Sequence, residues 1–232
     1  MLDNVVDVRE LSIQKHLEEV RTEIELVIPD NNLLSKMFIA GGSIRSLATY
    51  RNIVDYDIFL KDSDGIRELK ETLAYRQVLY ESKNSIGLIT STGKHIQFII
   101  CASGDPESVV GEFDFTCNQN HWDMGTRALT IHPDAYTMNL RINPNARNAM
   151  GTFLRVGKFL TKGYTYPPRE DMIHLGVKMT QHDPITTYSE LDESSRMNFT
   201  EEETKQVSEI IQMDIKPVMS VFKSRIGSAG GA

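Results

Sequence analysis

Two aspartates that lie two residues apart, Asp55 and Asp57, are the side chains with the clearest chemical potential in the sequence. They belong to a β-rich run at residues 54–60. Successive side chains of a strand point to opposite faces, so the two carboxylates project from one face. Carboxylates this close repel each other unless a cation lies between them, and hard oxygen ligands favour Mg²⁺ or Mn²⁺ over Zn²⁺. The pair therefore predicts a divalent metal site.

A glycine turn, Gly41-Gly42-Ser43, precedes the two aspartates. It joins a short apolar strand expected at residues 38–40 to a helix expected at 43–50. Glycines let the backbone approach a ligand closely, and a helix N-terminus offers free N–H groups to phosphate. Each motif alone is more often structural or merely solvated. Their order, in which a strand, glycine turn and helix precede a strand with two aspartates, is more specific and indicates metal-assisted phosphoryl or nucleotidyl transfer.

The same residues resemble the nucleotidyltransferase superfamily, especially the catalytic head of CCA-adding and bacterial poly(A) polymerase enzymes. Residues 41–45 (GGSIR) resemble that branch's glycine turn with its arginine, and residues 55–58 (DYDI) resemble its metal-binding Asp-x-Asp. Residues 113–118 (FDFTCN) are similar to its Asp-Phe-Thr-x-Asn strand, and residues 152–164 to its arginine-bearing neck helix. Among members of the superfamily, the chain looks like a compact type from viruses or phages.

The resemblance implies a role for each matching residue. Asp55 and Asp57 would hold two catalytic ions, and Asp114 would be either a third metal ligand or a ribose contact. The glycine turn would bind the triphosphate of an incoming NTP, while Arg155 and Lys158 would face its base or triphosphate. The nucleotide-binding positions implied in this way are Gly41, Gly42, Ser43, Arg45, Asn118, Arg155 and Lys158.

Some positions depart from the family pattern. Glu112 and Phe113 stand where the family has arginines, and Ala149 and Thr152 replace the aspartate and first arginine of its neck helix. These departures concern base selection and ribose recognition, whereas the metal-binding pair is intact.

The elements that must position these residues follow from periodicity. Apolar residues at helical spacing predict a helix at 11–28, and a second helix is expected at 63–75. Further strands are expected at 77–80, 86–90 and 95–100, with a hairpin turn at 91–93, and another strand at 112–118. After residue 147 the pattern is mostly helical.

This order predicts an α/β (α+β) fold, with a nucleotidyltransferase-like mixed sheet followed by a helical C-terminal part. The expected domains are a catalytic head with its N-terminal helix at 1–143, a helical neck and C-terminal domain at 144–226, and a flexible tail at 227–232.

Composition narrows the functional classes. The chain has 232 residues, 40% of them hydrophobic, and a net charge of −7, which argues against a protein that mainly coats duplex nucleic acid. Residues 141–178 are basic, however, and suit either an RNA acceptor or simply a solvated helix face. Cys101 and Cys117 form no zinc motif, no apolar run is long enough for a membrane span, and the N-terminus is acidic. We expect a cytoplasmic protein, in the host cytoplasm if it is viral.

The expected function is Mg²⁺- or Mn²⁺-dependent transfer of an NMP from an NTP to an acceptor hydroxyl, most simply an RNA 3′ end. Two alternatives stay open. The acceptor could be a protein or small molecule, or the fold could be a binding or structural module without catalysis.

Overall fold

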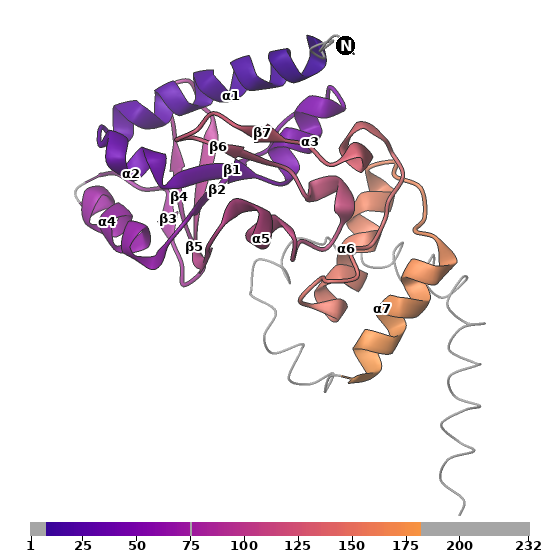
Figure 1. Ribbon diagram of the computed structural model, residues 1–232. Helices are drawn as coiled ribbons and strands as arrows, with labels where there is room; N and C mark the ends of the chain where they lie inside the picture. The colour runs from indigo at the N-terminus through magenta and orange to yellow at the C-terminus, as the bar shows by residue number, and fades with distance from the viewer. Residues whose placement is uncertain (1–7, 75, 182–232) are drawn as a thin grey trace, which may run out of the picture. The chain divides into compact units, whose positions relative to one another are not determined.

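The computed structural model describes residues 8–74 and 76–181, which form two compact units (Figure 1). The first unit reaches Met138 and the second begins at Asn139. The greater part of the helical domain expected at 144–226, together with the tail at 227–232, lies outside the described residues.

A single mixed sheet of seven strands forms the centre of the first unit, in the order β3-β4-β5-β2-β1-β6-β7. Strands β2 and β5 are parallel neighbours, whereas the other adjacent pairs are antiparallel. The strands are β1 (Met37–Ala40), β2 (Tyr56–Leu60), β3 (Tyr80–Glu81), β4 (Ser85–Ile89), β5 (His95–Ser103), β6 (His121–Asp123) and β7 (Leu129–Thr130). The α/β class and the mixed sheet expected from the sequence are confirmed.

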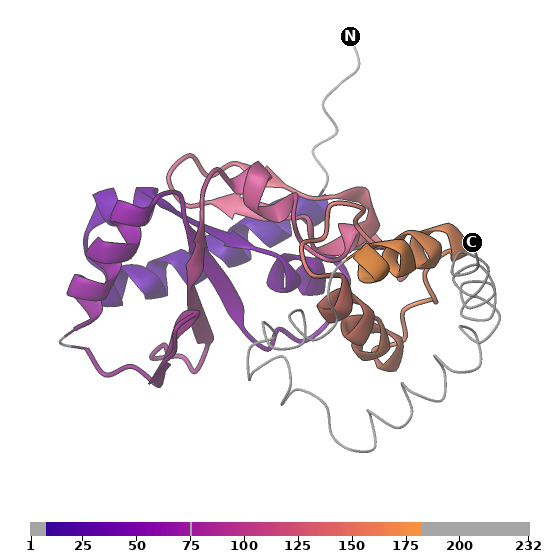
Figure 2. The same ribbon diagram turned by 90° about the horizontal axis from the view of Figure 1, so that it is seen from below.

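Four helices cover one face of this sheet, and a fifth lies on the opposite face (Figure 1). The first group is α1 (Val8–Val27), α2 (Asn31–Ser35), α3 (Gly42–Ala48) and α4 (Ser63–Leu73). The short α5 (Pro106–Val110) packs on the other face, against Phe38 and Phe59. Figures 1 and 2 both show α4 and α3 toward opposite ends of the first unit. The site described below is at the α3 end.

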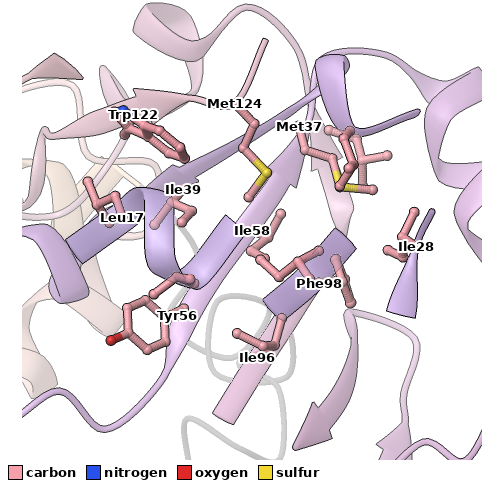
Figure 3. Close-up of a cluster of buried hydrophobic side chains, with 14 of the residues drawn as sticks. Leu17, Ile28, Met37, Ile39, Tyr56, Ile58, Ile96, Phe98, Trp122 and Met124 are labelled. Carbon is pink, nitrogen blue, oxygen red and sulfur yellow. The ribbon is translucent and has the colours of Figure 1, made fainter. Parts of the chain in front are cut away.

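The main core lies between the sheet and the first group of helices (Figure 3). Helix α1 contributes Ile13, Leu17, Val20 and Ile24, whose spacing puts them on one face of a helix. Central strands contribute alternate residues, so the inward-facing set includes Ile39, Tyr56, Ile58, Ile96, Phe98 and Trp122. Residues between these on the same strands consequently lie on the opposite face of the sheet, where α5 packs against Phe38 and Phe59.

One expected strand is wrong, and the strand expected at 77–80 is displaced, because β3 is Tyr80–Glu81. The alternation of Phe113, Phe115 and Cys117 predicted a strand at 112–118, but Thr116–Asn118 is a 3-10 helix, η1, and the strand that follows is β6. Consecutive turns satisfy the backbone here: the Phe113 N–H donates to the Val110 carbonyl, and the Asn118 N–H to the Phe115 carbonyl. Local turn bonds therefore replace the strand pairing that the alternation imitates.

The second unit contains α6 (Ala149–Thr161) and α7 (Arg169–Gln181). The Asn148 side chain caps α6 by accepting the Gly151 N–H at 2.8 Å. Two guanidinium nitrogens of Arg141 donate to the Asp171 carboxylate at 2.9 and 3.0 Å, and the Ile142 N–H donates to the same group. The loop before α6 is thereby joined to α7. In the described part of the chain, no helix is long and apolar enough to cross a membrane.

Candidate functional site

The two predicted metal ligands lie at the start of β2, at the α3 end of the sheet. Asp57 is the second residue of β2 and is half-buried, while Asp55 directly precedes the strand and is exposed. Tyr56 between them belongs to the main core, on the face covered by α1. Strand alternation therefore places Asp57 on the opposite face, where α5 also lies.

Tyr56 holds the start of β2 against α1. Its hydroxyl lies 2.7 Å from Nε2 of His16, and the two rings are stacked at 6.1 Å (Figure 3 shows Tyr56). Burial raises the pKa of Tyr56 to about 12, and burial lowers the pKa of His16. Both groups are consequently neutral at pH 7, and a neutral hydrogen bond fixes the strand that carries the aspartates.

The glycine turn lies directly beside Asp57, because Ala40, the last residue of β1, is the register partner of Asp57. Gly41 has φ +81°, a conformation that favours glycine, and its N–H donates to the Asn120 carbonyl at 2.9 Å. A Cβ on Gly41 would approach the Phe113 ring to 3.2 Å. The turn thus needs glycine both for its backbone conformation and for its close contact with residue 113.

Ser43 is the buried polar residue of this turn. The residue is only 4% exposed, and its Oγ has no hydrogen-bond partner among the residues that the structure describes. A buried hydroxyl without a partner costs free energy, so a position of this kind is usually explained by a ligand, water or ion. The hydroxyl is thus available to a ligand oxygen.

A hydrogen bond connects two motifs that are far apart in the sequence. The Arg45 Nη1 donates to the Asn118 Oδ1 at 2.7 Å, and Arg45 is 7% exposed. The bond joins α3 to η1, next to Cys117, whose thiol pKa is raised to about 11 by burial. Sequence reasoning predicted nucleotide contacts for Arg45 and Asn118 and missed their mutual bond. The bond positions the Asn118 amide beside the glycine turn.

Asp114 lies in the bend between α5 and η1 and is half-buried. Among residues 8–74 and 76–181, no three His, Cys, Asp or Glu side chains converge into a metal-holding group. Mg²⁺ is commonly held by one or two carboxylates together with substrate phosphates, and the hard oxygens of Asp55 and Asp57 fit that arrangement.

The remaining predicted residues lie on α6 of the second unit. Arg155 is exposed and Lys158 is half-buried. Their contact with a nucleotide stays a prediction, since each unit is described by itself. Two basic residues of the range 141–178 make contacts within the second unit. Arg141 forms an ion pair with Asp171, and the Lys178 ammonium donates to backbone carbonyls of the loop before α6.

The structure adds His121, which matches none of the sequence motifs described above. His121 is the register partner of Ala40 on β6, so it shares a face with Asp57, two strands away. It is 6% exposed, burial lowers its pKa, and Nδ1 has no hydrogen-bond partner within the described chain. Only the pairing of β6 with β1 reveals this placement.

Solved structures show what the fold is similar to. A structure described as a tRNA-processing enzyme in an apo form matches 85% of this chain and 56% of its own, with 15% identity and a TM-score of 0.56. A CCA-adding enzyme in complex with CTP matches 89% of this chain and 55% of its own, with 15% identity and a TM-score of 0.51. At such low identity the likeness concerns the fold alone, which is nucleotidyltransferase-like.

Sequence comparison shows the family. A protein of Bacillus phage SPbetaL7 named Gabija anti-defense 2 is 29% identical over 164 residues, which are 68% of this chain. The chain spans only 40% of the length of that relative. Residues 12–141, which contain the glycine turn, Asp55, Asp57 and η1, match the family described as Gabija anti-defense 2 family protein. The chain belongs to the Gabija anti-defense 2 family.

Proposed function

We propose that this protein is a divalent-metal-dependent nucleotidyltransferase that moves an NMP from an NTP to an acceptor hydroxyl. The observation that carries the proposal is the pairing of β1 with β2, which sets the glycine turn directly beside Asp57. A phosphate-binding turn next to acidic metal ligands is the arrangement that phosphoryl-transfer chemistry requires, since positioning and charge neutralisation provide most of the catalysis.

In this proposal, Asp55 and Asp57 hold Mg²⁺ or Mn²⁺. When bound, such ions lower the pKa of an attacking hydroxyl and stabilise the leaving oxygens. The backbone of Gly41 and Gly42 lies against the triphosphate, and the Ser43 hydroxyl donates to one of its oxygens. The acceptor oxygen attacks the α-phosphorus and releases its proton to solvent, while the bond to the leaving pyrophosphate breaks.

Other residues hold this arrangement in place. The Arg45 bond to Asn118 keeps α3 and η1 together, so that the Asn118 amide supports the nucleotide. The stacked pair of Tyr56 and His16 fixes the start of β2. Arg155 and Lys158 contact the base or the triphosphate, and Asp114 contacts the ribose or the metal.

The proposed acceptor is an RNA 3′ end, with the basic residues of 141–178 facing its phosphates. CCA-adding enzymes, with which this chain shares its fold, include one whose structure is in complex with a tRNA. Exposed cations of this range include Arg147 in the loop before α6, Arg155 on α6 and Lys162 directly after it.

A second candidate acceptor is favoured by the name of the phage relative, Gabija anti-defense 2. It implies action against a defence component of a host cell, so that the NMP would be transferred to a protein of that defence. This reading places the protein in the host cytoplasm. If the site binds nucleotide without transfer, the protein would act instead as a nucleotide-binding module.

The test is a labelling reaction. The protein is incubated with each α-labelled NTP, Mg²⁺ and either total RNA or protein from cells that carry the Gabija defence. Asp55→Ala and Asp57→Ala should abolish labelling, whereas Asp64→Ala, at a carboxylate that is 68% exposed on α4, should not. Label in RNA supports the first acceptor and label in protein the second. If the Asp55→Ala and Asp57→Ala variants label an acceptor as well as the parent protein does, the proposal is contradicted.

A further inference from the structure

The register of the sheet places Asp57 in a row that crosses all seven strands. The partners from edge to edge, which share one face of the sheet, are Tyr80, Gly87, Gln97, Asp57, Ala40, His121 and Thr130. We call this set the transverse row. Gln97, Gly87 and Tyr80 do not belong to the apolar cluster of α5, which forms around Phe38 and Phe59 and reaches β5 at Ile99.

Tyr80 lies flat over a strand at the end of this row. A Cβ added to Gly87 would lie 2.2 Å from Cε1 of Tyr80 and 2.6 Å from its Cζ, so the ring occupies the space above the glycine. Tyr80 remains 40% exposed although one side of its ring faces the sheet. Because residue 87 is glycine, the Tyr80 ring can pack directly against the strand, while its outer side faces solvent.

A polar network fixes the ring in this orientation. The Gln97 Nε2 donates to the Tyr80 hydroxyl at 2.7 Å and to the Ser85 Oγ at 3.1 Å. Gln97 is also the direct register neighbour of Asp57. Adjacent strands lie about 4.8 Å apart, so Gly87 is about 10 Å from Asp57 across the sheet. Tyr80 is therefore pre-positioned, and its hydroxyl points back toward the proposed metal ligand.

We propose that Tyr80 is a stacking platform for the terminal base of an RNA acceptor. This inference rests on the proposed function and deepens it, because it assigns a binding subsite to the acceptor. An acceptor nucleotide stacked on the Tyr80 ring extends its ribose along Gln97 toward Asp57. Aromatic side chains stack any base, since every base has a π-face, so the platform selects a nucleic-acid end without selecting its sequence.

The charges around Tyr80 favour nucleic acid over a peptide. Arg76 and Lys83, four residues before and three after it, are both exposed. The adjacent Glu81 lies 3.9 Å from Lys70, which offsets its charge. Exposed cations close in sequence to an exposed aromatic ring suit single-stranded RNA, whose backbone contacts the charges while a base stacks on the ring.

Fluorescence anisotropy with two short single-stranded RNAs tests the platform. One RNA ends in a 3′ adenosine, and the other ends in an abasic ribose. Stacking on an aromatic residue changes affinity by roughly 5- to 150-fold per base, so we expect the parent protein to prefer the adenosine end about tenfold or more. Tyr80→Leu should remove the preference, and Tyr80→Trp should keep it.

Two further variants separate the platform from general damage. Gly87→Ala retains the tyrosine but displaces its ring, so it should also remove the preference. Leu79→Ala changes the exposed residue directly before β3 and retains both Tyr80 and Gly87, so it should leave the preference intact.

Calorimetry with an NTP and Mg²⁺ distinguishes the inference from the proposed function. If the parent and Tyr80→Leu proteins bind the NTP equally and only the parent prefers the base, the platform is supported. If the NTP binds but the parent shows no preference, or if protein is labelled and RNA does not bind, the platform is refuted while the proposed metal site stands. If no NTP binds to the parent, the proposed function itself fails.

Discussion

Gly41→Ala should destabilise the first unit and weaken triphosphate binding, because two independent costs fall on one added methyl group. Gly41 has φ +81° and ψ −127°, in a region that residues with a Cβ occupy at a cost of about 1–3 kcal/mol. The new Cβ would also lie 3.2 Å from the Phe113 ring, which must shift. Together we expect the free energy of unfolding to fall by about 2–4 kcal/mol.

Gly93→Ala is the matched control for this change. Gly93 has a similar φ of +85° in the turn between β4 and β5, but a Cβ there would meet nothing within 4 Å. Its cost should therefore be the backbone cost alone, about 1–2 kcal/mol. The difference between the two variants measures the contact between residue 41 and Phe113.

Urea unfolding of both variants, followed by circular dichroism, measures these costs. Each kcal/mol corresponds to a shift in Tm of roughly 2–4 °C for a protein of this size, so a thermal melt provides a second reading. If Gly41→Ala unfolds at the same urea concentration as Gly93→Ala, the packing argument is wrong. If it unfolds like the parent, the conformational argument is wrong as well.

Three further changes have expected outcomes. Asp57→Asn should abolish Mg²⁺-dependent NTP binding in calorimetry and change the free energy of unfolding by less than about 1 kcal/mol, since the two side chains have the same shape; normal NTP binding would contradict the assignment. Because burial lowers the pKa of both His16 and His121, the unfolded chain binds protons more readily, and stability should fall as pH falls below about 6.5. Urea unfolding of a variant with both replaced by Gln should show a flatter pH dependence, and an unchanged profile would refute this. Binding of single-stranded RNA should weaken with salt at a slope of roughly −0.7 per phosphate contact, and Arg155→Ala should weaken it more than Lys162→Ala; the reverse order in an anisotropy titration would exclude the assigned role of Arg155.

The main elements could be predicted because their residues obey simple periods. The helical spacing from Ile13 to Ile24 predicted α1, and the glycines at 41 and 42 predicted the turn into α3. Strand alternation also places Tyr56 and Asp57 on opposite faces, and Tyr56 lies in the main core. These features depend on residues close together in the chain.

Features that depend on distant pairing could not be predicted in the same way. The bond between Arg45 and Asn118 spans 73 residues, and no periodic pattern predicts such a contact. The packing of Tyr80 depends on its register with Gly87, which is set by a hairpin. The strand expected at 112–118 was wrong for a different reason. Apolar residues alternate there as in a strand, but the backbone hydrogen bonds of the segment are made within turns.

The two edges of the sheet have a consequence for solubility. Both outermost strands, β3 and β7, are only two residues long, whereas the strands next to the centre are longer. Unpaired N–H and C=O groups along a sheet edge are where other chains add strands and begin aggregates, and very short edge strands limit that pairing. An incoming strand would find only a residue or two to pair with at either edge. The short edge strands thus limit edge-to-edge pairing of the described sheet with other chains.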